Sequence, residues 1–198
     1  MFRFLTAGES HGPGLTITIE GIPAGLELIE SEQHNQVRRR QKGYGRGGRM
    51  KIEKDHADIK GGIRHGITLG SPISMWIENK DFVNWKEAMD PSPVNHTIDK
   101  KQHTRIVPGH ADFAGALKYK QHDLRNILER ASARETTSRV AAGAVARTFL
   151  NHFNIDFKSR VLSIGNESTK ESDVHQIDWI YVENSEVRAE NEQLNDKF

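Results

Sequence analysis

The spacing of short strand-like runs in the first half of the chain constrains its fold most strongly. Four such runs follow one another closely and are separated by turn-forming residues: 50–53, 59–63, 66–69 and 73–78. Parallel strands need a crossover connection of a dozen or more residues, and no segment of that length lies between these runs. The spacing therefore predicts an antiparallel sheet built from hairpins.

Two earlier segments also predict strands. Residues 2–6 and 15–20 alternate between apolar and polar side chains, and Leu15, Ile17 and Ile19 fall on one face, which we expect to be buried. Residues 157–164 predict one more strand. The last thirty residues are polar and acidic, and we expect no closing element there.

Helices are predicted in two places. Ser31 is expected to begin a short helix that runs toward Arg40, and the clearest helix covers 133–153. Residues 85–89 allow a further short helix, within a turn-rich segment from 84 to 112. The longer helix has apolar residues at the spacing of a buried stripe, and Ser132 and Glu135 form a capping-box pattern at its start. The fold class is therefore α+β.

The sequence GESHG at residues 8–12 matches the G-x-S-x-G pattern of serine hydrolases. That pattern requires a serine on a turn between a strand and a helix, whereas here a second strand follows. A simple turn is the ordinary alternative. A third reading is that the glycines allow a ligand to approach and that His11 exchanges a proton with it.

Basic residues are concentrated in one glycine-rich segment. Seven of them and no acidic residue lie between Arg38 and Lys51, although the net charge is only +1. The G-x-G-x-x-G match at 43–48 lacks the strand and helix of a dinucleotide-binding fold. A solvated basic surface, an RNA-binding loop and a site for phosphate or carboxylate groups all remain open.

A second group of arginines lies where the long helix is predicted to begin. Arg130 and Arg134 flank Ser132, and an exposed helix N-terminus favours anions. Of the ten histidines, His110 stands out because Pro108 and Gly109 place it in a turn near Asp112. Loop histidines and arginine clusters together indicate proton transfer on a phosphorylated substrate.

Composition narrows the classes of protein. The chain has 198 residues with 35% hydrophobic and 28% charged residues, and it contains no cysteine, which excludes disulfides and thiol catalysis. No apolar run is long enough to span a membrane, and the histidines show no recognised metal-ligand spacing. We expect a cytoplasmic protein without a metal site.

Four segments, in order, resemble the signature segments of the chorismate synthase family. They are GESHGPG at 8–14, RRQKGYGRGGRM at 39–50, PGHAD at 108–112 and RASARETTSRVAAG at 130–143, with LGSPI at 69–73 and LRNILERASARE at 124–135 in support. The resemblance extends over essentially the whole chain. Members of the family are much longer, so we expect 1–198 to be a single domain truncated on its C-terminal side.

The resemblance implies a lyase of the shikimate pathway, which serves aromatic amino acid biosynthesis. Such an enzyme converts 5-enolpyruvylshikimate 3-phosphate to chorismate and phosphate by a 1,4-trans elimination that requires reduced FMN, with NADPH as a possible reductant. It also implies a cytoplasmic homotetramer and a β-α-β sandwich of antiparallel sheets enclosing helices, incomplete in this chain. No nucleic acid or membrane partner is implied.

The resemblance further implies roles for individual residues. His11 acts as the acid toward the departing phosphate, and His110 protonates the reduced flavin. The substrate-binding and flavin-binding residues are as follows: Ser10, Arg49 and Arg134 for the substrate; Arg40, Arg46, Arg130, Ala131 and Ser132 for the flavin.

Two positions differ from many family members. Gly48 and Val107 stand where arginines are common, and Arg105 is the nearest candidate to replace the second arginine. Two alternatives to the enzyme remain: a catalytically incomplete fragment that folds or binds FMN only, and an RNA-binding module that uses residues 38–51.

Overall fold

The computed structural model describes residues 1–45, 54–93, 101–169 and 172–198. Its core is a four-stranded antiparallel sheet with the strand order β1-β2-β6-β3. The strands are β1 (Arg3–Ala7), β2 (Gly14–Glu20), β3 (Asp58–Gly61) and β6 (Ile73–Glu78). The predicted antiparallel sheet and the mixed α and β composition are thus confirmed, whereas the predicted strand at 50–53 lies outside the described residues.

The buried face of the sheet follows directly from the alternation in the sequence. Leu15, Ile17 and Ile19 are almost completely buried, as predicted. They stand opposite Ile77, Met75 and Ile73 of β6 in register, so one apolar row faces another across the two central strands. This row is the centre of the hydrophobic core.

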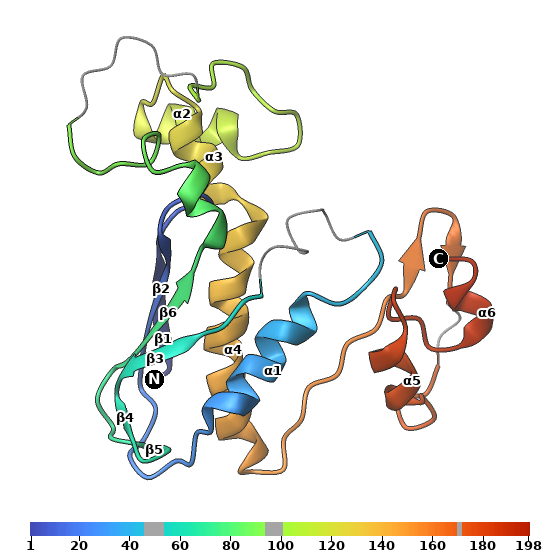
Figure 1. Cartoon of the computed structure of the whole chain (residues 1–198). Coiled ribbons are helices and arrows are strands. Elements are labelled where there is room, and N and C mark those ends of the chain that lie inside the picture. The colour runs from blue at the N-terminus through green and yellow to red at the C-terminus, as the bar shows by residue number, and fades with distance from the viewer. Residues whose placement is uncertain (46–53, 94–100, 170–171) are drawn as a thin grey trace.

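Two helices cover that face of the sheet and lie side by side (Figure 1). They are α1 (Glu30–Arg40) and α4 (Thr136–Asn151), and Val37, Ala141 and Val145 bring their apolar sides into the core. A short 3-10 helix, η3 (Ala133–Glu135), precedes α4. The predicted helix at 133–153 is therefore confirmed in position but begins with a tighter turn.

The remaining elements are short. Two hairpins are formed by β4 (Ile63–Arg64) with β5 (Ile67–Thr68) and by β7 (Ser163–Ile164) with β8 (Glu167–Ser168). The helices η2 (Lys80–Asn84), α2 (Asp112–Tyr119) and α3 (Arg125–Ala131) lie beyond one end of the sheet, and α5 (Trp179–Asn184) and α6 (Glu192–Asn195) lie near the C-terminus (Figure 1). None of the helices in the described ranges is long and apolar enough to cross a membrane.

Several local predictions were wrong. The strand predicted at 157–164 is limited to its last two residues, which pair with β8. Among the described residues no strand pairs with 157–162, and the Val161 N–H donates to the Arg188 carbonyl. The C-terminal thirty residues do contain helices, since Asp178 and Asn191 cap α5 and α6 with their side chains. Residues 85–89, where a short helix was predicted, form turns with a hydrogen bond from the Met89 N–H to the Trp85 carbonyl at 2.9 Å, and the short helix of this region, η2, ends before them at Asn84.

Candidate active site

The GESHGPG loop connects β1 to β2, and its glycines are required by the backbone. Gly8 has a φ of +102°, and a Cβ there would lie 2.3 Å from the carbonyl oxygen of Gly14. A Cβ on Gly14 would in turn collide with the Trp76 ring. These glycines therefore let the two ends of the loop close tightly. Because β2 follows and no helix does, the serine-hydrolase geometry is excluded.

Asn79 holds this loop from the inside. Its side-chain amide donates to three carbonyl oxygens of the loop: those of Glu9 at 3.0 Å, Ser10 at 3.2 Å and Gly12 at 2.8 Å. Its backbone N–H donates to the Pro13 carbonyl at 3.0 Å. Asn79 is 2% exposed, so these bonds are made away from water and fix the path of the loop.

His11 is attached to α3 through Glu129. The His11 Nδ1 lies 2.9 and 3.0 Å from the two carboxylate oxygens of Glu129, and the His11 backbone N–H donates to the same carboxylate at 2.8 Å. The Ser10 N–H donates to the backbone carbonyl of Glu129 at 2.9 Å. Ser10 is buried and His11 is partly exposed, so the loop presents the imidazole rather than the serine.

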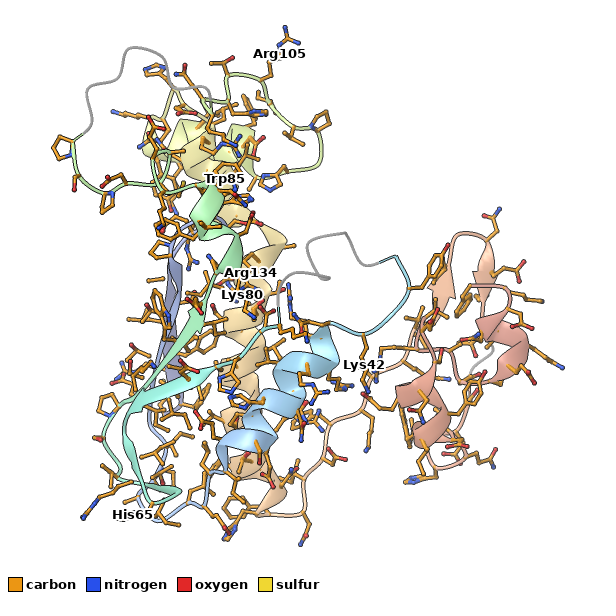
Figure 2. All side chains as sticks on the ribbon, viewed as in Figure 1. Lys42, His65, Lys80, Trp85, Arg105 and Arg134 are labelled. Carbon is orange, nitrogen blue, oxygen red and sulfur yellow. The ribbon has the colours of Figure 1, made fainter. Side chains whose placement is uncertain are left out.

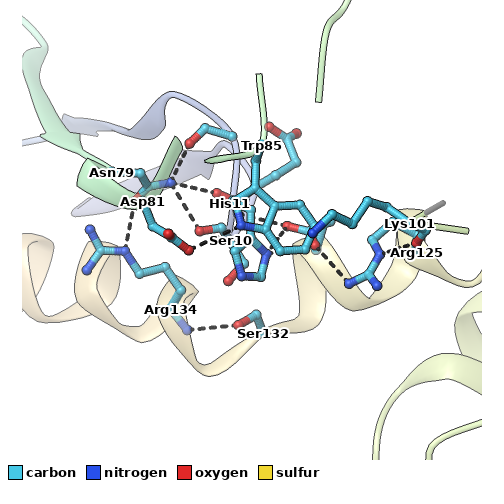
Figure 3. A network of polar contacts seen from close by, with 12 residues as sticks. Ser10, His11, Asn79, Asp81, Trp85, Lys101, Arg125, Ser132 and Arg134 are labelled. Carbon is cyan, nitrogen blue, oxygen red and sulfur yellow. Dashed lines mark hydrogen bonds and ion pairs between the residues drawn. The ribbon is translucent and has the colours of Figure 1, made fainter. Parts of the chain in front are cut away.

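An aromatic ring covers the imidazole of His11. The Trp85 ring stacks on it with 3.9 Å between ring centroids, and the Trp85 Nε1 donates to Asp81 at 3.2 Å (Figure 3). The Lys101 ammonium lies 4.0 Å and the Arg125 guanidinium 5.4 Å from the Trp85 ring. The Trp85 ring therefore contacts the His11 imidazole and also attracts two cations.

The Glu129 carboxylate is ionised in this setting. Burial by itself would raise its pKa, but the hydrogen bonds from the His11 side chain and backbone, and the charges of His11 and Arg125, hold the pKa below its usual value. The Arg125 guanidinium lies 3.4 Å from a Glu129 oxygen, one helical turn away. An ionised, buried carboxylate is thus paired on both sides.

Arg134 lies in the interior, beneath the same loop (Figures 2 and 3). Its guanidinium donates to the Asn79 side-chain oxygen at 2.9 Å, to the Glu78 carbonyl at 3.2 Å and to the Asp55 carboxylate. The Asp55 side chain is completely buried, and the Arg134 residue is 6% exposed. Arg134 is therefore linked through Asn79 to the loop that carries His11.

Arg40, at the last turn of α1, joins the same buried carboxylate. Its guanidinium lies 3.6 Å from Asp55 and donates to the Thr136 hydroxyl and the Ala133 carbonyl, each at 2.9 Å. The end of α1 is thereby fixed to the start of α4. Arg40 and Arg134, which the sequence places 94 positions apart, meet at Asp55.

The segment 130–132 lies at the end of α3. Arg130 donates to the Thr6 carbonyl at 2.8 Å and to the Thr6 hydroxyl at 2.7 Å, which joins α3 to β1. The Ser132 hydroxyl accepts the Arg134 N–H at 3.3 Å. Glu135 contacts Thr6 and Arg139 instead of the Ser132 backbone, so the predicted capping box forms only in its serine half.

A hollow of about 530 Å³ lies between α2 and α3. Arg130 and Ala131 line it from α3, and Ala111 and Lys118 line it from the other side. Small-molecule sites have volumes in this range.

His110 belongs to a turn immediately before α2. Its Nδ1 lies 2.5 Å from the Asp112 carboxylate, which also accepts the Val107 N–H at 2.8 Å. Asp112 is completely buried, and His110 is partly exposed. Among the described residues no hydrogen bond or ion pair joins His110 to His11, although α2 packs against α3, which carries Glu129.

Three predicted positions cannot be compared with the structure. Arg46, Gly48 and Arg49 lie outside the described residues. Val107 is 38% exposed, and Arg105 is exposed at the outer edge of the segment that precedes α2, where it points away from the protein (Figure 2).

Sequence reasoning missed the residues that connect the predicted ones. Glu129, Asn79, Asp55 and Trp85 were not singled out, although each is polar or aromatic and contacts a predicted residue. For Glu129 no local pattern indicates the contact, because it lies 118 positions from His11 in the sequence. For the others the contact depends on the folded sheet.

Comparisons with known proteins now add to this geometry. The sequence model of the family described as chorismate synthase matches residues 2–198. The chain belongs to the chorismate synthase family. A chorismate synthase of Aquifex aeolicus (strain VF5) is 59% identical over 173 residues, which cover 85% of this chain and 42% of that protein. Those of Gloeobacter violaceus (54%) and Geobacillus thermodenitrificans (52%) cover 87% and 94% of this chain.

A solved structure agrees with the family assignment. A crystal structure of chorismate synthase superimposes with a TM-score of 0.76 and is 41% identical, covering 100% of this chain and 51% of that one. The chain spans about half the length of the chorismate synthases that it matches.

Proposed function

We propose that the protein to which this chain belongs is a chorismate synthase. It eliminates phosphate from 5-enolpyruvylshikimate 3-phosphate in a 1,4-trans reaction and releases chorismate. The observation that carries the proposal is the His11 imidazole, which is held by Glu129 and Trp85 on a rigid loop, in a chain that the family model matches from end to end. A fixed imidazole is suited to give a proton to a leaving phosphate.

The proposal divides the arginines into two groups. Arg40 and Arg134 have partners within the chain, and with Asp55 they hold the site together. Arg49 is proposed to bind the substrate and Arg46 the phosphate-bearing ligands, as the resemblance implies. Ser10 and Arg134, which the Asn79 side chain joins, are proposed to bind the substrate, and Arg40 to bind the flavin, as the resemblance implies. Several fixed cations favour a polyanionic substrate.

The described residues are compatible with part of a flavin site. The hollow between α2 and α3 is lined by two of the predicted flavin residues, Arg130 and Ala131, together with Ala111, the neighbour of His110. Lys118 adds a second cation to it, which suits an electron-rich anionic group. Reduced FMN, when bound, supplies electron density to the reacting substrate, and NADPH is proposed as its reductant. His110, the neighbour of Ala111, is proposed to supply a proton at this hollow, as the resemblance implies.

The finer architecture is also proposed from the family. The described sheet, with α1 and α4 on one face, corresponds to one layer of a β-α-β sandwich, and the remaining layer belongs to the part of the relatives that this chain does not span. The complete protein is proposed to be a cytoplasmic homotetramer of a single chorismate synthase domain. Neither nucleic acid nor membrane is part of the proposal.

An anaerobic assay tests this function. The chain is measured alone and in a chimera in which it replaces the matching segment of the Aquifex aeolicus relative. Reduced FMN and 5-enolpyruvylshikimate 3-phosphate are supplied, and chorismate absorbance and phosphate release are followed. We expect the chimera to turn over, and we expect His11→Ala and His110→Ala to lower kcat at least about 100-fold each.

Surface histidines provide the controls. His122→Ala and His175→Ala change exposed residues away from the loop and should leave kcat within about twofold. Activity that survives both His11→Ala and His110→Ala would contradict the assigned roles. If the 198-residue chain alone binds FMN but never turns over, the fragment alternative is favoured.

A further inference from the structure

Glu129 contacts His11 at two independent points. Both carboxylate oxygens approach the ring Nδ1, at 2.9 and 3.0 Å, and one of them also accepts the backbone N–H of the same residue at 2.8 Å. Glu129 is 3% exposed, so water does not compete for these oxygens. One buried side chain thus fixes the ring and the backbone of His11 together.

This contact determines which ring nitrogen carries the hydrogen. An ionised carboxylate only accepts hydrogen bonds, so the Nδ1 must be the protonated nitrogen. A neutral imidazole has one N–H, which leaves a lone pair on Nε2. Within the part of the chain that the structure describes, Nε2 makes no hydrogen bond. Nε2 is therefore the nitrogen that can exchange a proton with a ligand.

The ring cannot easily turn over to present its other nitrogen. Trp85 stacks on it with an angle of 23° between the ring planes, and Asp81 holds the Trp85 indole N–H. Charged groups surround the pair: Glu129 and Arg125 from α3, Asp81 from η2, and Lys101 over the indole. A flip of the ring would break the contact between Nδ1 and Glu129. Among the described residues, no other carboxylate is bonded to this nitrogen.

We propose that Glu129 is a positioning residue, which keeps His11 with its hydrogen on Nδ1 and aims Nε2 at the ligand. The role of this geometry in the reaction rests on the proposed function. In that reaction, protonated His11 gives its Nε2 proton to the departing phosphate oxygen. The C–O bond breaks and its electron pair stays on that oxygen, while the electron pair of the C–H bond broken in the same 1,4-elimination completes the double bonds of the product. The C–H proton leaves to the medium, and His11 is left neutral with its hydrogen on Nδ1 until it takes up a proton for the next turnover. Glu129 keeps its negative charge throughout.

Ring ¹⁵N NMR of the 198-residue chain tests the tautomer directly, without substrate. At a pH where the histidines are neutral, the His11 Nδ1 should show the shift of a protonated nitrogen and Nε2 that of an unprotonated one, with the signals assigned by their loss in His11→Ala. Glu129→Gln keeps the shape of the side chain but only one acceptor oxygen, and we expect a weaker preference for Nδ1–H. Glu129→Leu should abolish the preference.

A matched carboxylate serves as the control. Glu135→Gln alters a partly buried carboxylate that contacts Thr6 and Arg139, and it should leave the His11 pattern unchanged. The proposal is overturned if His11 carries its hydrogen on Nε2 in the unmodified chain. It is also overturned if Glu129→Leu has a native amide spectrum and an unchanged His11 ring pattern. If the leucine variant does not fold, the same result in Glu129→Gln overturns it.

Kinetics in the chimera separate this inference from the proposed function. There Glu129→Gln should lower kcat about 10-fold or more and leave KM within about twofold, because it alters the acid and not substrate binding. A chimera without turnover, in which His11 still shows the Nδ1–H pattern, refutes the function and supports the positioning role. Normal kcat in a folded Glu129→Gln chimera refutes the catalytic step.

Discussion

Two histidine–carboxylate pairs in this molecule differ in how they are built. His110 pairs with Asp112, two residues away, inside one turn, and Asp112 also holds the Val107 N–H of the same turn. His11 pairs with Glu129 across 118 positions of the sequence. The first pair needs only a local backbone conformation. The second exists only after β1, β2 and α3 have packed, so its geometry depends on the stability of the whole domain.

Arg134→Met should produce the largest difference between the two pairs. It leaves Asp55 buried with the longer contact to Arg40 as its one ion pair among the described residues, and it removes the Asn79 bond, so we expect the free energy of unfolding to fall by about 3 kcal/mol. Urea unfolding followed by circular dichroism measures this. Arg139→Met, which removes an exposed arginine paired with Glu135, should cost less than about 1 kcal/mol. Equal losses would show that the buried network does not support the domain.

Asn79→Ala isolates the link between that network and the His11 loop. Three loop carbonyls and the Arg134 guanidinium lose a partner, and we expect a cost of about 1–3 kcal/mol. Amide hydrogen exchange should accelerate at 8–14 and remain unchanged at 107–112. Asn84→Ala removes an exposed amide that donates to the Asp81 carboxylate, and it should change neither segment.

The two pairs also show what can be predicted from a sequence. The apolar alternation of Leu15, Ile17 and Ile19 predicted the buried face correctly, and the close spacing of the runs predicted antiparallel pairing. The nearby Asp112 was identified as a partner for His110 because the two share one turn. Such features are local, and local geometry follows from residue type and spacing.

What the sequence did not predict depends on tertiary contacts. Glu129 lies in a helix that no local pattern connects to the loop at His11, and Asn79 reaches the loop only because β2 and β6 are neighbours. Arg134 was expected at the substrate from the resemblance, a role that stays a prediction, but its burial beside Asp55 depends on where α4 packs. The predicted strand at 157–164 was limited because strand formation requires a partner strand.

Asp112→Asn tests the local pair. The amide retains one acceptor oxygen for either Val107 or His110, so the loss of the second bond should cost about 1 kcal/mol. Hydrogen exchange should increase only at 107–119, and the loop at 8–14 should be unaffected. The matched control is Asp90→Asn, because the Asp90 carboxylate is exposed and accepts the Ser92 N–H within its own turn. Faster exchange at both loops would mean that the two pairs are coupled.

The smallest expected effect is the pH dependence contributed by Glu129. Its pKa in the folded chain lies below the usual 4.5, whereas the unfolded chain has the usual value. The unfolded state therefore takes up a proton first as the pH falls, and the stability from this carboxylate is complete above 4.5 and is lost as the pH falls through the folded pKa.

Glu129→Gln removes this contribution because glutamine does not titrate. We expect its free energy of unfolding to depend less steeply on pH below 4.5 than that of the unmodified chain, when both are measured by urea unfolding at closely spaced pH values. Glu87→Gln, which removes an exposed carboxylate outside the His11 network, is the control for the loss of one negative charge. Identical slopes for the unmodified chain and Glu129→Gln would mean that the contact with His11 does not favour the ionised carboxylate. In that case packing alone would hold Glu129 against His11. The His11–Glu129 pair would then resemble the His110–Asp112 pair in its distances but would add no electrostatic stability.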